Sequence, residues 1–243
     1  MLKEKKYRKD YQGEKIVTDR TYTKGVWEDV TEFIPNVVTN EQISNRACVI
    51  GNGLYREGFK MQSFLKPQGL LGADTMQTYG CNALYRDFNP DFLIATGKDI
   101  VKEIAESEYS DNNIVYSSAK NLIEYPKKFY LIPHNSYMDA GTTAMYLAAF
   151  DGHKTIYLLG HDYNDEGMNS NIYADTPGYA SHDYIPDWTK IIRAKRHMFD
   201  LYDDVDWVWV TPYGTNIVHQ EWKPCTNLRQ LSTKAFMNET NLN

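Results

Sequence analysis

Short apolar runs, each ending in glycine or a polar turn, recur along the chain from Arg46 onward. Several precede a stretch that can form a helix, and this alternation is typical of an α/β sheet. The runs that we interpret as strands are ACVI, MQTYG, DFLIATG, NIVYSS, KKFYLIP, TIYLLG and WVWV. The pattern predicts a Rossmann-like, doubly wound, mostly parallel sheet from about Arg46 to Pro212.

Three stretches have the spacing of helices. DAGTTAMYLAAFDG begins with an acid and small residues and ends with glycine, and KDIVKEIAES follows a predicted strand directly. The third, PDWTKIIRAKRHMFDLYDDV, has one face at helical spacing formed by Trp188, Ile191, Ile192, Lys195, Met198, Phe199 and Tyr202. We expect the first and third helices to pack on the sheet.

Residues 1–45 have a different texture from the rest of the chain. They are polar, with short β-prone runs and no helical stripe. We therefore expect an N-terminal arm or hairpin at 1–45. Residues 46–243 are expected to form one Rossmann-like domain.

Charge and cysteine content narrow the classes of partner. The chain has 26 basic and 32 acidic residues, for a net charge of -6, which repels a nucleic-acid backbone. The cysteines, Cys48, Cys81 and Cys225, match the spacing of neither a zinc site nor a disulfide framework, as in a reducing compartment. No stretch approaches about eighteen consecutive apolar residues. We expect a cytoplasmic protein with no membrane span, and leave open whether it forms a homo-oligomer.

Nearly the same phrase occurs twice, as GNGLYREGF from Gly51 and as GCNALYRDF from Gly80. Each copy follows an apolar run, so Asn52 and Asn82 come just after predicted strands. Ligands of open α/β sheets bind beyond the carboxyl ends of the strands, and an asparagine both donates and accepts hydrogen bonds. The copies therefore predict one shared crevice that reads a base or sugar. The alternative is that both asparagines only form tight turns.

The glycines of the first copy add a weak signal. A turn with Gly51 and Gly53 allows backbone amides to approach a phosphate. The third glycine of the dinucleotide fingerprint is missing, and so is a P-loop, so a nicotinamide dehydrogenase and a P-loop NTPase are not supported.

A third candidate group lies in DAGTTAMYLAAFDGHKTIYLLGHDYN. Gly141 and Thr142 open a predicted helix whose amides could bind an anion. Asp162 and Tyr163 follow the next strand, where a carboxylate could bind ribose or a metal and a hydroxyl could bind phosphate. In the alternative reading, Thr142 caps the helix and Asp162 begins a turn.

These motifs together carry a family resemblance. VIGNG, CNALYRDF with DFLIATG, and AGTTAMYLAAFDGHKTIYLLGHDY resemble the bacterial sialyltransferases of the Campylobacter type, and also the DUF115 group with its archaeal pterin pyrophosphokinases. The resemblance spans about residues 49–184 and leaves out the first 45. CNALYRDF followed by PDFLIA is also similar to uncharacterised marine bacteriophage proteins, which would place the protein in the host cytoplasm.

The resemblance implies a role for each motif. Asn52 and its glycines would lie at the nucleotide phosphate and sugar, Asn82 would contact a cytidine-sugar donor, and Gly141 and Thr142 would bind the nucleotide. Tyr163 would stabilise the departing phosphate.

The catalytic base is harder to assign. The family pattern resembles S-H-Y-x-G-H, and here ASHDYIPDW keeps Ser181 and His182 but has proline near the second histidine. His182 is the candidate base, and an exposed loop histidine is the alternative. Tyr173 and Tyr179 are further candidates for phosphate contact. We regard His134 as a second base candidate and His197 as structural.

Three functions stay open. The first is a sialyltransferase-like glycosyltransferase with a nucleotide-sugar donor, an unknown acceptor and no cofactor. Because the sequence lacks D-x-D and clustered carboxylates, we expect it to be independent of metal. The second is a pterin-type pyrophosphokinase using ATP and magnesium, for which the candidate ligands are Asp74, Asp139 and Asp162. The third is a catalytically inactive nucleotide-binding or structural phage protein.

Overall fold

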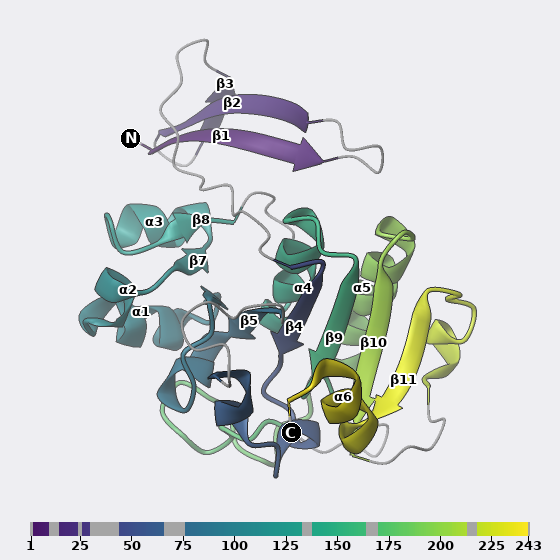
Figure 1. The fold of residues 1–243 in the computed structure, drawn as a ribbon. Helices are drawn as coiled ribbons and strands as arrows, with labels where there is room; N and C mark the ends of the chain where they lie inside the picture. Colours follow the sequence, from purple (N-terminus) through teal and green to yellow (C-terminus); the bar gives the residue numbers. More distant parts are fainter. Residues whose placement is uncertain are drawn as a thin grey trace.

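The structure is a computed structural model that describes residues 2–9, 15–23, 26–29, 44–65, 76–132, 138–163, 170–212 and 218–242. Eight strands form one sheet in the order β11-β10-β9-β4-β5-β6-β7-β8, and every neighbouring pair is parallel (Figure 1). The strands are β4 (Arg46–Ile50), β5 (Gln77–Cys81), β6 (Phe92–Ile94), β7 (Val115–Ser117), β8 (Tyr130–Leu131), β9 (Thr155–Leu159), β10 (Asp206–Thr211) and β11 (Leu228–Ser232).

The strand order contains one reversal of direction. From β4 the chain adds β5, β6, β7 and β8 on one side, and then crosses over to place β9, β10 and β11 on the other side of β4. This is a doubly wound arrangement, and in such sheets a crevice lies beyond the carboxyl ends of the strands at the reversal, here β4 and β9. The fold therefore places a binding crevice at the carboxyl ends of β4 and β9.

Helices cover both faces of the sheet. The helices are α1 (Lys98–Glu106), α2 (Tyr109–Asn112), α3 (Ala119–Glu124), α4 (Ala140–Phe150), α5 (Trp188–Leu201) and α6 (Thr233–Thr240). Side chains of a strand alternate between the faces, so Cys48 and Ile50 pack in a core with residues of α1, α3 and α6. Ala47 and Val49 pack in a second core with residues of α4 and α5. The sheet is thus the middle of three layers.

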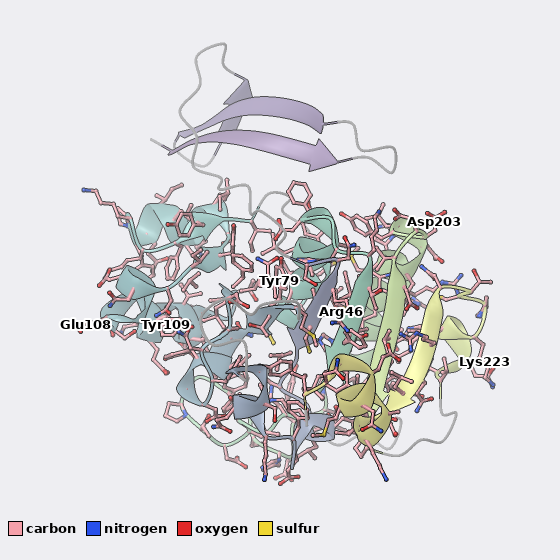
Figure 2. The ribbon with its side chains drawn as sticks, viewed as in Figure 1. Arg46, Tyr79, Glu108, Tyr109, Asp203 and Lys223 are labelled. Atoms are coloured by element: carbon pink, nitrogen blue, oxygen red, sulfur yellow. The ribbon has the colours of Figure 1, made fainter. Side chains whose placement is uncertain are left out.

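The α4 helix lies at the centre of the second core. Ten of its eleven residues are buried, and it packs against β4, β5 and β6 of the sheet and against α5. A helix that is apolar on all sides belongs in an interior. Figure 2 shows the contrast between the interior, where Tyr79 lies, and the periphery, where Glu108, Asp203 and Lys223 lie. The first residues of α4 are therefore held in place by the packing of the helix on the sheet and on α5.

Four short 3-10 helices are described in the connections. They are η1 (Leu54–Arg56) and η2 (Met61–Leu65) after β4, η4 (Asn82–Arg86) after β5, and η5 (Gln220–Trp222) before β11. η1 and η4 are formed by the two copies of the repeated phrase. Each copy therefore turns the chain away from the sheet directly beyond a strand end.

A second, antiparallel sheet forms near the N-terminus. It has the order β1-β2-β3, with β1 (Leu2–Lys9), β2 (Lys15–Thr23) and β3 (Val26–Asp29). The β1 and β2 strands pair antiparallel, and so do β2 and β3. The division of the chain into an arm at 1–45 and a domain at 46–243 stays a prediction.

The predicted α/β fold is confirmed, with one correction to its extent. All seven predicted strands and all three predicted helices form. The sheet does not stop near Pro212, because β11 adds an eighth strand beside β10. Every residue of β11 is only partly buried, so its sequence LRQLS lacks the apolar run of an inner strand. The short helices α2 and α3, and α6 after β11, were not predicted either.

Candidate functional site

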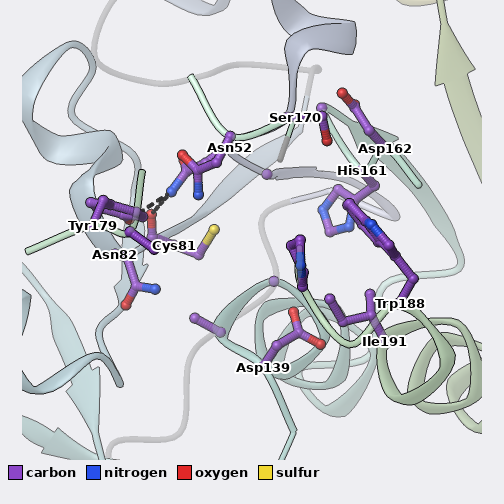
Figure 3. A pocket seen from close by; sticks show the side chains of 18 of the residues that line it. Asn52, Cys81, Asn82, Asp139, His161, Asp162, Ser170, Tyr179, Trp188 and Ile191 are labelled. Carbon is purple, nitrogen blue, oxygen red and sulfur yellow. Dashed lines mark hydrogen bonds between the residues drawn. The ribbon is translucent and has the colours of Figure 1, made fainter. Parts of the chain in front are cut away.

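A pocket of about 270 Å³ opens at the carboxyl ends of β4, β5 and β9. The start of α4, one side of α5 and the segment 170–187, which we call the strap, complete its walls (Figure 3). Its lining consists of Gly51, Asn52, Gly53, Cys81, Asn82, Asp139, Ala140, Gly141, Gly160, His161, Asp162, Ser170, Asn171, Tyr179, Ala180, Tyr184, Pro186, Trp188, Ile191 and Lys195. The pocket lies at the crevice that the strand order creates.

The two glycines after β4 allow two loops to touch. A Cβ on Gly51 would lie 2.2 Å from the carbonyl oxygen of Gly160, and a Cβ on Gly53 would lie 2.3 Å from Oδ1 of Asp162. The amide of Gly51 donates to Leu159 O at 2.8 Å, and that of Gly53 to Gly160 O at 2.9 Å. Both amides thus bond to the chain after β9, and the phosphate contact expected of these glycines stays a prediction.

Asn52 is held in one orientation and presents an oxygen to the pocket. Its Nδ2 donates to Cys81 O and to the hydroxyl of Tyr179, each at 3.1 Å. A carbonyl oxygen can only accept, so the amide nitrogen must face Cys81. The buried Oδ1 has no hydrogen-bond partner among the described residues. Asn52 therefore has an acceptor to offer a ligand.

Asn82 lines the same pocket but bonds to the protein. Its backbone is left-handed, with a φ of 47°, and its Oδ1 accepts from the amides of Thr96 (3.1 Å) and Gly97 (3.4 Å). Asparagine tolerates this conformation better than most residues. The two asparagines of the repeated phrase thus share a crevice, as predicted, and Asn82 also has the turn role that was the alternative.

The Asp162 carboxylate holds the first turn after β4. Its Oδ1 and Oδ2 both accept from the amide of Tyr55, at 3.1 and 3.0 Å. Burial raises the pKa of this carboxyl from 3.8 to about 7, and the Tyr55 amide and the Lys195 charge act in the opposite direction. Near neutral pH the Asp162 side chain is therefore a mixture of its protonated and its ionised form.

The start of α4 already holds a carboxylate. Asp139 caps the helix, accepting from the amide of Thr142 at 3.0 Å and from its hydroxyl at 2.5 Å, and Thr142 is fully buried. Asp139 thus provides the cap that was the alternative reading, and the anion-binding role of Gly141 and Thr142 stays a prediction. Within the described residues, Gly141 is in the pocket lining and Thr142 is not.

Two further polar atoms in the pocket wall have no hydrogen-bond partner among the described residues. They are Nε2 of His161 and Nε1 of Trp188, and both are buried. Burial, and the positive charge of Lys195, lower the pKa of His161 well below its usual value, so the ring is neutral. Figure 3 shows these two side chains and Asn52 around the same hollow. Together they offer an indole donor, an amide acceptor and a neutral imidazole.

The strap is fastened to both copies of the repeated phrase. Backbone bonds join Leu54 to Ser170 and Ile172 to Asn52, at 2.9 and 2.8 Å. The Tyr179 hydroxyl accepts hydrogen bonds from Nδ2 of Asn52 and from the amide of Ala83, and burial raises its pKa. Tyr179 thus closes the pocket as a wall residue.

Two arginines hold the strap from its outer side. Arg56 is 5% exposed and donates to the hydroxyl of Tyr173 at 2.8 Å. Arg86 donates to Thr176 Oγ1 and to Pro177 O, each at 2.9 Å. Tyr173, a candidate for phosphate contact, also donates to Asp87 and is outside the described pocket lining. Its hydroxyl is engaged with the protein.

The two proposed catalytic side chains are near the pocket without lining it, as far as the described residues go. His182 is 58% exposed, and its Nε2 lies 3.6 Å from Asp175 Oδ2. The Tyr163 ring stacks on Trp209, with a centroid distance of 5.4 Å, and meets Trp222 edge-on. Their catalytic roles stay predictions.

Some expectations fall outside the described residues. His134 and Asp74 are among them, so their positions test nothing. His197 is exposed on α5. In the described part of the chain there is no group of three or more His, Cys, Asp or Glu side chains that could hold a metal. No described helix is long and apolar enough to cross a membrane.

Comparison with known proteins gives a distant structural likeness. No protein-family model matches the chain, and no curated protein sequence matches it. Solved structures that are similar include a variant of the sialyltransferase CST-II in complex with CMP, at a TM-score of 0.44 and 12% identity over 82% of this chain and 99% of that one. CstII from Campylobacter jejuni with the substrate analogue CMP-3FNeuAc has a TM-score of 0.44 and 13% identity over the same shares. At these values the likeness carries no argument about the chemistry of this chain.

Among the lining residues that were not identified as site residues from the sequence are His161, Trp188 and Lys195. Trp188 and Lys195 were predicted only as positions on one face of a helix. Lys195 is 4% exposed on α5, and burial lowers the pKa of its ammonium group. A lysine in an otherwise apolar stripe was the available signal, because lysine is rarely fully buried without a partner.

Proposed function

We propose that the pocket binds a nucleotide sugar, with a CMP-sugar as donor, and that the protein is a sialyltransferase-like glycosyltransferase that works without a metal. Four buried side-chain polar atoms of the described residues have no hydrogen-bond partner, and the observation that carries the proposal is that three of them, Asn52 Oδ1, His161 Nε2 and Trp188 Nε1, belong to lining residues of the pocket. Buried polar atoms are normally satisfied, so a polar ligand is the natural partner. A nucleoside, with donors and acceptors on its base and ribose, fits this mixture.

The position of the pocket supports the same proposal. Nucleotides bind at the reversal point of doubly wound sheets, and the cavity lies beyond β4 and β9 at that point. Asn82 and Gly141 also belong to its lining. The resemblance of the sequence motifs selects cytidine among the nucleosides.

In the proposed chemistry the acceptor hydroxyl attacks the sugar carbon directly. The new C–O bond forms as the bond to the phosphate oxygen breaks, CMP leaves with the electron pair, and the configuration inverts. His182 takes the hydroxyl proton, and its place in the strap between the wall residues Ala180 and Tyr184 supports this role. Tyr163 stabilises the departing phosphate.

Thermal shift measurements with CMP, CDP, UDP, GDP and ATP, each with and without magnesium, test the binding step. We expect CMP to stabilise the protein most, by about 2.7 kcal/mol at a hundredfold its dissociation constant, and equally with and without magnesium. No shift with any nucleotide would contradict the proposal.

Hydrolysis of a CMP-sugar tests the chemistry before the acceptor is known. His182→Ala should lower turnover about a hundredfold or more while the affinity for CMP stays near wild type. His197→Ala, on the exposed side of α5, is the matched control. Full activity in His182→Ala would transfer the role of base to another group, and binding of CMP without hydrolysis would favour an inactive nucleotide-binding protein.

The lining carboxylates give a reason to test a second function. Asp139 and Asp162 both face the pocket, as a pyrophosphokinase using ATP and magnesium would need. Both also bond to backbone amides, which reduces their freedom to bind a metal. A larger shift with ATP and magnesium than with CMP would support this alternative.

A further inference from the structure

The α5 helix brings one cation into the pocket. Lys195 is 4% exposed, and Ile192, Met198 and Phe199 on the same helix are buried with it. Removing an ammonium group from water is costly unless partners compensate for the lost hydration. The structure therefore needs an explanation for a lysine at this position.

The contacts of Lys195 leave most of its donors unused. Among the described residues its Nζ has one hydrogen bond, to His161 O, at a long 3.4 Å, and it lies 6.0 Å from the centre of the Trp222 ring. An ammonium group has three donor hydrogens. Among the described residues Lys195 forms no ion pair within 4.0 Å, although Asp139 and Asp162 stabilise its charge at longer range. The oxygens of these carboxylates instead accept from Thr142 and Tyr55.

We propose that Lys195 binds the phosphate of the nucleotide and thereby makes the pocket select nucleotides over nucleosides. The inference rests on the proposed function, since it assigns a partner within the same pocket. It also draws on two observations from the pocket. The amides of Gly51 and Gly53 bond to the chain, and the start of α4 holds Asp139. Among the described lining residues, Lys195 is the only lysine or arginine.

The charges around Lys195 are consistent with one bound anion. Apart from the tyrosines Tyr179 and Tyr184, the other titratable groups in the described lining are Asp139, Asp162, His161 and Cys81. The histidine is neutral, and burial raises the pKa of the Cys81 thiol to about 12, which keeps it neutral too. When Asp162 is protonated, the positive charge of Lys195 is offset only by the carboxylate of Asp139. A phosphate can then accept hydrogen bonds from the Lys195 ammonium group without repulsion from a second carboxylate.

The test compares cytidine with CMP by calorimetry in the wild type, in Lys195→Met and in Lys190→Met. Lys190 lies on the same helix, and its side chain is 85% exposed, so its variant is the matched control. We expect the wild type and Lys190→Met to bind CMP more tightly than cytidine. In Lys195→Met the affinity for CMP should fall about tenfold or more while that for cytidine stays within about twofold, because a charged hydrogen bond is lost.

Several outcomes would overturn the inference. In Lys195→Met, unchanged CMP affinity, or equal losses for both ligands, would mean that Lys195 has only a structural role. If Lys195→Met does not fold, Lys195→Gln removes the charge and keeps a donor, and it should show the same selective loss for CMP. The wild type alone is also decisive, because equal affinity for cytidine and CMP would contradict a phosphate contact. Binding of neither ligand would instead reject the proposed function.

Discussion

The two copies of the repeated phrase reach the same pocket with opposite uses of their asparagines. Asn52 donates to Cys81 O and to Tyr179 and leaves its oxygen towards the pocket. Asn82 uses its oxygen to hold the amides of Thr96 and Gly97. The first copy therefore presents chemistry to a ligand, whereas the second shapes the loop after β6.

The arginines of the two copies share a task. Arg56 bonds to Tyr173 and Arg86 bonds to Thr176 and Pro177, so both hold the strap. The two copies, which follow the neighbouring strands β4 and β5, thus hold the strap at two points. The arginine thus has the same role in both copies, which is to hold the strap, whereas the asparagine has a different role in each copy.

The largest expected effect concerns the carboxylate that supports only the first copy. Asp162 binds the Tyr55 amide, and burial raises its pKa from 3.8 to about 7. The folded state therefore holds the proton more tightly than the unfolded state, and stability falls as pH rises through about 7. From pH 5 to pH 8 we expect this group to lower the free energy of unfolding by about 3 kcal/mol.

Urea denaturation across this pH range checks the prediction. Asp162→Asn, which keeps an acceptor for Tyr55, should remove most of the decline, and the exposed Asp203→Asn should leave it unchanged. An equal decline in wild type and Asp162→Asn would mean that Asp162 ionises normally in the fold.

The second effect separates the two arginines. Arg56 is 5% exposed, whereas 21% of the Arg86 side chain is exposed in its ion pair with Glu103. We expect Arg56→Met to lower the free energy of unfolding by about 2 kcal/mol, because a buried charged hydrogen bond is lost. Arg86→Met should cost about 1 kcal/mol or less. Denaturation curves of the two variants give the comparison directly, and equal costs would show that burial does not distinguish the copies.

A third, smaller effect follows from the backbone of Asn82. Its φ of 47° is unfavourable for alanine, so Asn82→Ala should lower the free energy of unfolding by about 1 to 2 kcal/mol through strain and lost bonds to Thr96 and Gly97. Asn82→Gly also lacks the hydrogen bonds to Thr96 and Gly97, but glycine adopts this φ without strain. Its cost in unfolding free energy should therefore be smaller than that of Asn82→Ala. If Asn82→Ala melts like the wild type and binds CMP less tightly, the asparagine is primarily a ligand contact.

The smallest effect is on affinity at the first copy. Asn52→Ala removes this buried acceptor and should weaken CMP binding by about 0.5 to 1.5 kcal/mol, the usual value of one neutral hydrogen bond. Calorimetry measures this change, with Asn89→Ala as a control at an asparagine outside the described lining. Unchanged affinity would place the ligand away from Asn52.

The inner strands and long helices were predictable because each buries an apolar run or face of its own. The β11 strand was not, since its residues are half polar and take their conformation from pairing with β10. The convergence of Asn52, Asn82 and Asp162 was predictable because parallel strands end at one edge of the sheet. Which atoms stay available was not predictable, because that depends on tertiary contacts such as those of Gly53 with Gly160 and of Asn52 with Tyr179.

The burial of α4 has a consequence for the exchange of amide hydrogens with solvent. Ten of its eleven residues are enclosed, so its amides can exchange only when the whole fold opens. Residues 180–185 of the strap are exposed and can open locally. Slowly exchanging amides of α4 and rapidly exchanging amides of the strap thus lie on two walls of the same pocket. A ligand that contacts both walls should slow the hydrogen exchange of the strap.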